Sequence, residues 1–246
     1  MKTVILLSGK KSTGKDTSYD YIKDFFKCAD CGGTGRRDGL VYDFQLAFPH
    51  CEMCLGKGYG YTKKIKKMSF ADPLKSLCKS AFGLTDIQCY GESGERETST
   101  VIRWEDLNLN YHGLRGEKHI QDFVTAREIL QIVGTNVMRS FYPNVWAKAA
   151  TIAAMKSEED IVVFTDARFP NEIEEFQVLA DDEKINLLVL RLHRDSANID
   201  SHKSETALDS WDEEQKFQYN IFNNGSLDEL KEMLRSVICE GQLIND

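Results

Sequence analysis

Short runs of hydrophobic residues alternate along the chain with segments in which hydrophobic residues recur every three or four positions. Continuous apolar runs are typical of strands buried on both faces, and the wider spacing is typical of helices with one buried face. The runs predict strands at residues 3–7, 63–70, 161–166, 185–192 and 219–222. The spacing predicts helices at 14–26, from 71 onward, across 124–156 with a break at Tyr142-Pro143-Asn144, at 171–179 and at 227–239. This alternation predicts an α/β fold with a parallel sheet covered by helices on both faces.

The first predicted strand leads into a loop bounded by Gly9 and Gly14, and a predicted helix follows. The loop reads Gly-x-x-x-x-Gly-Lys and resembles the phosphate-binding loop of P-loop proteins. Glycines let the backbone turn so that its N–H groups face an anion, and the N-terminus of the helix adds a positive dipole end. Lys15 would bring a full charge to the β- and γ-phosphates. We therefore expect ATP to bind at Gly9, Lys10, Ser12, Thr13, Gly14, Lys15, Asp16 and Thr17.

The residues after the lysine depart from the commonest form of this loop. Asp16 follows Lys15 directly, and the hydroxyl comes one position later, at Thr17. GTPases place a hydroxyl immediately after the lysine to hold Mg²⁺, whereas nucleoside monophosphate kinases often carry Gly-Lys-x-Thr. The departure favours a kinase.

The composition is that of an ordinary globular protein. The chain has 246 residues, of which 41% are hydrophobic and 28% charged, and a formal net charge of −8. This acidic balance argues against broad nucleic-acid binding. No apolar run approaches the length needed to span a bilayer, and the first strand begins at once, without the pattern of a signal peptide. We therefore expect an intracellular protein with reduced thiols.

Four of the seven cysteines form two Cys-x-x-Cys pairs, each followed by Gly-x-Gly at the same spacing. Nineteen residues separate the pairs, within the range of a four-cysteine zinc site. The repeat resembles the zinc knuckles of DnaJ-type cochaperones, and the alternatives are a disulfide or a redox dithiol. We expect a structural Zn²⁺ in an insertion at residues 28–61, interrupting a main domain formed by 1–27 and 62–246. The predicted ligands are Cys28, Cys31, Cys51 and Cys54.

Charged residues follow the fourth hydrophobic run. Asp166 ends the run 161–166, and Arg168 lies two positions later. Because ligands bind at the carboxyl ends of parallel strands, Asp166 is a candidate for orienting Mg²⁺. The alternative is an N-cap for the next helix. Arg127 and Gln131 are four positions apart on a predicted helix, so they share a face.

Two polar segments remain ambiguous. The lysines of residues 63–67 are either a phosphate-binding run or a solvated strand end, and the second reading is favoured. Residues 83–118 contain Arg96, Arg103 and Trp104 among acidic residues. They form either a mobile lid or substrate loop, or a plain surface excursion.

Several stretches together resemble the bacteriophage-type deoxynucleoside monophosphate kinases. The most discriminating are Arg-x-x-x-Gln-x-x-Gly-Thr, at 127–135, and Asp-x-Arg-Phe-Pro-Asn-Glu, at 166–172. The others are 8–17, Trp146, 202–205 and 223–227. The resemblance spans the chain apart from the cysteine insertion. It implies a three-layer P-loop fold and ATP-dependent conversion of deoxynucleoside monophosphates to diphosphates.

The resemblance also suggests roles for single residues. Lys15 would stabilise the transferring phosphoryl group, Thr17 and Asp166 would hold Mg²⁺ or its water, and Asp16 would fix the loop or help place the acceptor. Arg127 and Arg168 would grip the acceptor monophosphate, and Gln131 would read the base. Arg194, with Arg191 as a second candidate, would cover the phosphates as a lid cation. We expect no membrane or direct nucleic-acid partner, a cytoplasmic location (the host cytoplasm if phage-encoded), and a homodimer as a candidate assembly.

Two alternative functions remain at this point. The first is a P-loop kinase for another small phosphorylated substrate. The second is an ATP-gated module that binds nucleic acid or protein through the cysteine insertion. Residues 28–60 contain three basic and four acidic residues, and a surface that follows phosphates should be basic.

Overall fold

The computed structural model describes residues 1–27, 63–107, 122–195, 206–214, 216–241 and 243. The chain divides into two compact units, each with its own core. The first unit comprises Met1–Phe70 and Thr151–Asp246, and the second comprises Ala71–Ala150.

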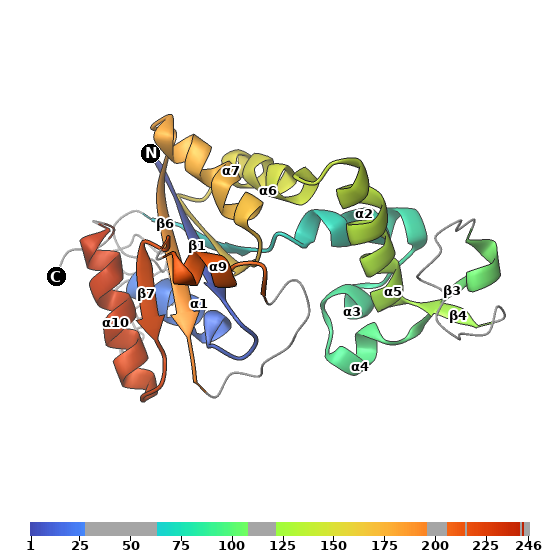
Figure 1. The fold of residues 1–246 in the computed structure, drawn as a ribbon, viewed down its shortest axis with the longest axis horizontal. Coiled ribbons are helices and arrows are strands. Elements are labelled where there is room, and N and C mark those ends of the chain that lie inside the picture. The colour runs from blue at the N-terminus through green and yellow to red at the C-terminus, as the bar shows by residue number, and fades with distance from the viewer. Residues whose placement is uncertain (28–62, 108–121, 196–205, 215, 242, 244–246) are drawn as a thin grey trace, which may run out of the picture. The chain divides into compact units, whose positions relative to one another are not determined.

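A five-stranded parallel sheet forms the centre of the first unit (Figure 1). Its strand order is β2-β5-β1-β6-β7. The strands are β1 (Lys2–Gly9), β2 (Ile65–Met68), β5 (Ile161–Ala167), β6 (Ile185–His193) and β7 (Tyr219–Phe222). The predicted parallel sheet is therefore confirmed, and each predicted strand contributes to it. The central strand β1 is buried along nearly its whole length, which explains its continuous apolar sequence.

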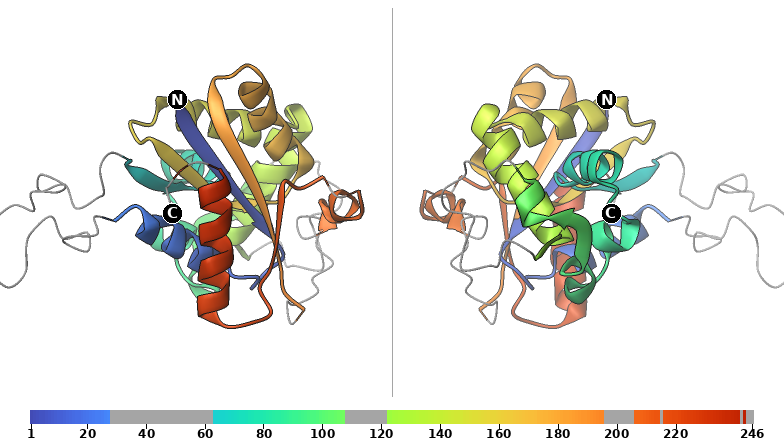
Figure 2. Two further views of the ribbon diagram at one scale, coloured as in Figure 1. Left: turned by 90° about the vertical axis from the view of Figure 1, so that its left-hand side faces the viewer. Right: turned by 90° about the vertical axis from the view of Figure 1, so that its right-hand side faces the viewer.

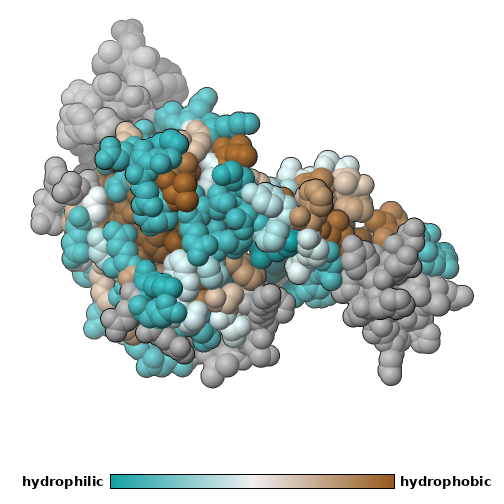
Figure 3. Space-filling model, turned by 45° about the horizontal axis from the view of Figure 1, so that its top comes forward, coloured by the Kyte–Doolittle hydropathy of each residue, from teal (hydrophilic) through white to brown (hydrophobic). Residues whose placement is uncertain are grey.

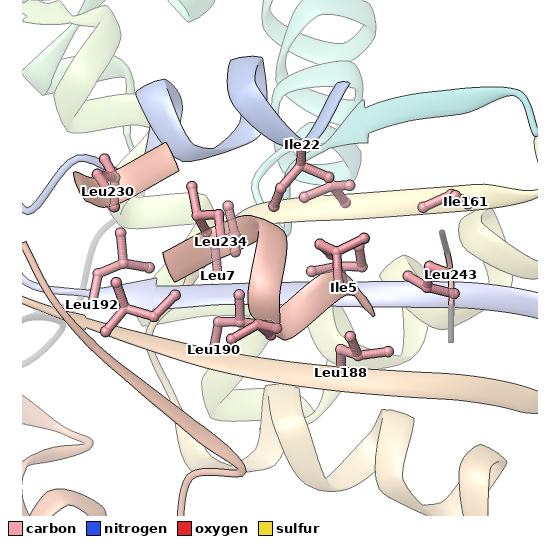
Figure 4. Close-up of a cluster of buried hydrophobic side chains, with 14 of the residues drawn as sticks. Ile5, Leu7, Ile22, Ile161, Leu188, Leu190, Leu192, Leu230, Leu234 and Leu243 are labelled. Carbon is pink, nitrogen blue, oxygen red and sulfur yellow. The ribbon is translucent and has the colours of Figure 1, made fainter. Parts of the chain in front are cut away.

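Helices cover both faces of this sheet (Figure 2). On one face, α1 (Lys15–Phe25) and α10 (Leu227–Glu240) pack on alternate residues of the strands. Figure 4 shows Ile5 and Leu7 of β1 on the face of the sheet that carries α10, in one cluster with Leu230 and Leu234 of that helix. On the other face lies α7 (Pro170–Asp181), whose Phe176 contacts Phe164 of β5 at 5.2 Å between ring centroids. Burial of one such side chain contributes about 2 kcal/mol.

The connections that leave β1 and β5 diverge at the carboxyl ends of these two neighbouring strands. The chain leaves β1 into α1 on one face, and leaves β5 into α7 on the other face. In open parallel sheets, such a divergence opens a crevice in which ligands bind. The fold therefore directs attention to the loop after β1 and to the residues that end β5.

The second unit is mostly helical and contains a small two-stranded sheet. Its core is built from buried side chains that include Cys78, Trp104, Val124 and Ile129. Its elements are α2 (Asp72–Phe82), α3 (Asp86–Tyr90), α4 (Ser93–Arg96), β3 (Ser99–Arg103), η1 (Trp104–Asp106), β4 (Phe123–Thr125), α5 (Ala126–Gln131), η2 (Ile132–Arg139) and the first part of α6 (Val145–Lys156). In the first unit, α9 (Asp209–Glu213) lies between β6 and β7 in sequence.

The predicted helical region 124–156 differs from the structure in one respect. Its break is confirmed, because η2 ends at Arg139 and α6 begins at Val145. The residues Ile132–Arg139 form a π-helix rather than a continuation of α5. Gly134 lies in this wide turn, where an added Cβ would come within 2.6 Å of the Leu74 side chain. Such segments are rare and have no distinctive local pattern of hydrophobic residues.

The surface is mixed in character. Hydrophobic areas are visible on the second unit, at the right of Figure 3. Among the described residues of that unit, Val101 and Phe141 are strongly exposed. None of the described helices is long and apolar enough to cross a bilayer.

Candidate active site

The loop after β1 has backbone geometry that only small residues accommodate. Gly9 and Gly14 have φ values of 149° and 99°, in the region that disfavours side chains. A Cβ at Gly9 would lie 2.6 Å from the carbonyl oxygen of Leu192, and one at Gly14 would lie 2.6 Å from Nδ2 of Asn223. Ser12 also has a positive φ, of 65°. Both glycines of the predicted phosphate loop are therefore required by close packing as well as by the turn.

Hydrogen bonds from buried groups hold this loop in shape. The Thr13 hydroxyl donates to the carbonyl of Lys10 at 2.9 Å, and the amide of Asn223 donates to the carbonyl of Thr13, also at 2.9 Å. Asn223 is itself buried and follows β7, where its backbone N–H donates to the carbonyl of His193. Its role in supporting the loop was not predicted, because nothing in the local sequence indicates a partner so distant in the chain.

Lys15 places its ammonium inside the loop. Its Nζ donates to the carbonyl oxygens of Gly9 and Lys10, at 2.7 Å each. The positive charge therefore lies beside the backbone that would cradle phosphates, at the N-terminus of α1. An anion at this position would meet both the ammonium and the dipole of the helix.

Asp166 lies at the carboxyl end of β5, next to β1. Its Oδ2 accepts a hydrogen bond from the Ser69 hydroxyl at 2.5 Å, and its Oδ1 accepts one from the backbone N–H of Phe70 at 3.0 Å. The alternative reading as a helix cap is wrong, because α7 begins at Pro170 and its N-cap residue is Phe169. The carboxylate is held at the end of the sheet where a hard cation bound to phosphates would be expected.

Glu172 fixes the backbone that carries Arg168. Its side chain is only 2% exposed, and its Oε2 accepts hydrogen bonds from the backbone N–H groups of Arg168 at 2.8 Å and Phe169 at 3.1 Å. Arg168 itself is partly exposed. A buried acidic residue satisfied by backbone donors is a structural support, and its short sequence spacing to Arg168 could have indicated this.

Arg191 does not have the predicted role of a lid cation. Its side chain is buried, donates to the Ser8 hydroxyl at 3.0 Å, and forms a bidentate ion pair with Asp212 of α9. Charge pairing in the interior explains the difference, because a buried guanidinium must be fully partnered. Arg191 thus links Ser8, the residue before the loop, to α9. Lys10 of the loop approaches the same helix, with its Nζ 3.4 Å from Oδ1 of Asp209. Arg194 follows β6 and is exposed.

The lysines before the second unit point to different partners. Lys63 donates to the carbonyl of Leu243, and Lys66 lies 3.8 Å from Glu159. Lys67 instead donates to Oδ1 of Asp16 at 2.6 Å. They do not gather into one phosphate-binding run, in agreement with the favoured reading of a strand end. Asp16 is exposed, and Thr17 is half-buried in the first turn of α1.

Arg127 and Gln131 belong to the second unit. Arg127, in α5, forms an ion pair with Glu97 at 2.6 Å, and Gln131 is exposed at the end of the same helix. Thr125 caps α5 with the capping-box partner Glu128. Trp146 donates its indole N–H to the carbonyl of Gly134 at 2.9 Å. The structure therefore brings together the loop, Asp166 and the backbone of Arg168 in the first unit, and Arg127 with Gln131 in the second.

The comparisons with known proteins bear on both units. A family model of deoxynucleotide monophosphate kinases matches residues 98–234, more than half of the chain. The chain belongs to this family. A protein of Acanthamoeba polyphaga mimivirus that carries the provisional name deoxynucleotide monophosphate kinase is 26% identical over 215 residues, which cover 77% of this chain and 96% of the viral protein. The predicted kinase activity toward deoxynucleotide monophosphates is thus supported beyond its motifs.

The matched segment of this kinase includes Arg127, Gln131, Asp166, Arg168 and Arg194. The phosphate loop precedes that segment, so the geometry of the loop is an independent observation. The four cysteines of the predicted zinc knuckle lie outside the described residues, as do the predicted limits of the insertion. Within the described parts of the chain, no group of three or more potential metal-ligating side chains is found.

Proposed function

We propose that the chain transfers the γ-phosphoryl group of ATP to a deoxynucleoside monophosphate, producing ADP and a deoxynucleoside diphosphate for DNA synthesis. The observation that carries this proposal is the closed phosphate loop around Lys15, beside the carboxylate of Asp166. A loop with obligate glycines, an internal ammonium and a helix N-terminus suits a polyphosphate far better than an uncharged ligand. The family supplies the acceptor class.

ATP phosphates fit the donor set of the loop. The backbone N–H groups from Gly9 to Gly14 would surround the β-phosphate, and Lys15 would exchange its carbonyl partners for phosphate oxygens. Lys10, Ser12 and Thr13 belong to the same cradle. Phosphoryl transfer requires alignment and charge neutralisation more than covalent chemistry by the protein. Lys15 and the helix dipole therefore lower the free energy of the charge that develops on the transferring group.

A Mg²⁺ ion fits the oxygen ligands near the loop. The Asp166 carboxylate, already held by Ser69 and Phe70, would bind the ion or its water, and the Thr17 hydroxyl would contribute from α1. When bound, Mg²⁺ would neutralise part of the phosphate charge. Asp166 lies at the carboxyl end of β5 and Thr17 in the first turn of α1, so the two proposed oxygen ligands would come from two elements next to the loop.

Arginines are the proposed ligands of the acceptor monophosphate. Arg127 and Arg168 each carry a planar fork that can bind two phosphate oxygens, and Gln131 would form hydrogen bonds with the base. Arg194, exposed after β6, is the proposed cation that covers the phosphates during transfer. The ion pair of Arg127 with Glu97 would be exchanged for the substrate phosphate.

The cysteine pairs are proposed to hold one structural Zn²⁺. Cys28, Cys31, Cys51 and Cys54 supply four thiolates, which close the tetrahedral coordination and leave no open position for catalysis. The metal would supply folding energy to a short, glycine-rich segment.

The decisive experiment measures ADP release with ATP and each deoxy- and ribonucleoside monophosphate. We expect turnover with at least one deoxynucleoside monophosphate and much weaker use of acceptors without a nucleobase, such as phosphorylated alcohols. Lys15→Ala protein serves as the inactive control. Equal use of unrelated phosphorylated acceptors, or no turnover with any deoxynucleotide, would contradict the proposal.

A further inference from the structure

The end of β2 contacts two carboxylates that flank the phosphate loop. Lys67, in β2, donates to Asp16, the residue after Lys15. Just beyond β2, the Ser69 hydroxyl and the backbone N–H of Phe70 both donate to the Asp166 carboxylate. One short stretch of chain therefore holds an acidic side chain from α1 and another from the end of β5.

We infer that Lys67 is a positioning residue for phosphoryl transfer that acts through Asp16. The inference rests on the proposed function of the loop as the ATP site. It concerns a residue that lies outside the matched family segment, at 98–234. In this view Lys67 keeps the Asp16 carboxylate neutralised and turned toward β2, away from the phosphates and from the Lys15 ammonium.

The geometry of Lys67 is specific. Its Nζ lies 2.6 Å from Oδ1 of Asp16 and 5.5 Å from the centre of the Tyr19 ring. Asp16 and Tyr19 are three positions apart in α1, so they share a face of the helix. Two groups of α1 thus fix one ammonium from β2. Burial raises the pKa of the Tyr19 phenol, and the neighbouring Lys67 ammonium partly offsets this rise.

Stability alone is a weak reason for this pair. The side chains of Lys67 and Asp16 are 42% and 79% exposed, and exposed ion pairs contribute little to folding free energy. The neighbouring Lys66 makes a looser contact with Glu159, at 3.8 Å. Lys66 therefore provides a neighbouring lysine of the same strand with a weaker ion pair, against which the effect of Lys67 can be compared.

The electrostatic argument follows from the place of Asp16. An acidic side chain in the first turn stabilises a helix, because it lies near the positive end of the dipole. The same end must attract a polyanion, which a bare carboxylate would repel. An unpaired Asp16 could also attract the Lys15 ammonium away from the phosphates. Lys67 removes both effects while leaving the carboxylate within the first turn.

A double-mutant cycle tests the inference. The variants are Lys67→Ala, Asp16→Asn and the double variant, with Lys67→Arg as a conservative rescue and Lys66→Ala as the matched control. We expect Lys67→Ala to lower kcat/KM by about 10- to 100-fold, on the scale of a small misplacement of reacting groups. Lys67→Arg should recover most of this loss, and Lys66→Ala should match the unaltered protein. In the Asp16→Asn background, Lys67→Ala should cause no further loss.

A binding measurement separates this inference from the proposed function. With a fluorescent, non-hydrolysable ATP analogue, Lys67→Ala should weaken binding several-fold, and the added Asp16→Asn change should restore it. If no deoxynucleotide is phosphorylated, the proposed function fails, while this binding cycle still decides the role of Lys67. Unchanged kinetics and binding in Lys67→Ala would overturn the inference. Additive losses would overturn it as well, because Lys67 would then contact phosphate by itself.

Discussion

Asn223 donates its side-chain amide to the backbone carbonyl of Thr13, at 2.9 Å and across 210 positions of sequence. A Cβ added to Gly14 would lie only 2.6 Å from the same amide nitrogen, so this contact leaves no room for a side chain at position 14. The residue after the last strand thus supports the phosphate loop that follows the first strand. The segments that follow the first and the last strand of the chain therefore meet at this loop, and the shape of the loop depends on both.

Replacing Asn223 should loosen the phosphate loop. In Asn223→Ala, the buried Thr13 carbonyl loses its donor, which should lower the free energy of unfolding by about 1–3 kcal/mol. ATP affinity should fall more than acceptor affinity. Asn224→Ala is the matched control, because Asn224 is exposed and accepts from the backbone of Asp195 instead. Equal effects of the two substitutions on ATP binding would contradict this role.

The local part of the site could be predicted from sequence for a simple reason. A buried apolar run that ends in Gly-x-x-x-x-Gly-Lys determines strand, turn and helix within 25 residues of the N-terminus, and Asp166 follows from a similar run. Partners distant in sequence could not be predicted. The sequence predicts Arg191 as an exposed cation, whereas its side chain is buried and forms an ion pair with Asp212, 21 positions away. The π-helix at Ile132–Arg139 likewise has no local signal, because its wide turn reflects packing.

Lys15→Ala should abolish turnover while the fold remains intact. The ammonium donates to the loop carbonyls of Gly9 and Lys10, so its loss removes charge from the site more than it disturbs the core. Loss of one preorganised charge contact lowers rates by about 10²–10³, and a lysine at the transferring group should have at least this effect. ADP release and thermal unfolding should be measured on the same preparation. Near-normal turnover by well-folded protein would refute the assignment of the loop.

The two proposed acceptor arginines should separate acceptor binding from ATP binding. Arg127→Ala and Arg168→Ala should each raise the KM for the deoxynucleotide by about 10- to 100-fold, the range expected for a lost hydrogen bond to a charged group. The KM for ATP should change little. Arg103→Ala is the control, since Arg103 is exposed and pairs with Glu105 at 3.2 Å. If either variant lost ATP affinity with unchanged acceptor kinetics, its assignment would be wrong.

Stability should fall in alkaline solution because of a buried thiol in the second unit. Burial raises the pKa of Cys78 from an ordinary value of 9.0 to about 11, and the nearby Cys89 thiol adds to this rise. The unfolded chain therefore loses its thiol proton first. The stabilising contribution is complete below about pH 9 and is lost as the pH rises toward about 11. Denaturant unfolding at several pH values should show this decline, and Cys78→Ala should make it shallower. An unchanged slope in the variant would exclude Cys78 as its source.

Metal content should test the cysteine repeat directly. Four thiolates spaced as two Cys-x-x-Cys pairs predict about one Zn²⁺ per chain. Cys31→Ser should lower metal content and the thermal stability of the insertion, because a short, glycine-rich segment builds little core of its own. Kinase activity should persist at low temperature, since a closed four-thiolate site offers no position for substrate. Cys239→Ser, which changes a cysteine outside the repeat, is the matched control for loss of a single thiol.

The zinc prediction also specifies what the metal protects. Chelation should expose residues 28–60 to limited proteolysis while leaving the sheet of the first unit resistant, because the insertion begins after α1 and returns into β2. Since Lys67 belongs to β2 and Ser69 follows it, their contacts with Asp16 and Asp166 should remain with the resistant sheet, and activity at low temperature should remain with them. Protein prepared without metal that is equally stable and equally resistant to protease across 28–60 would show that the cysteines do not hold a structural zinc.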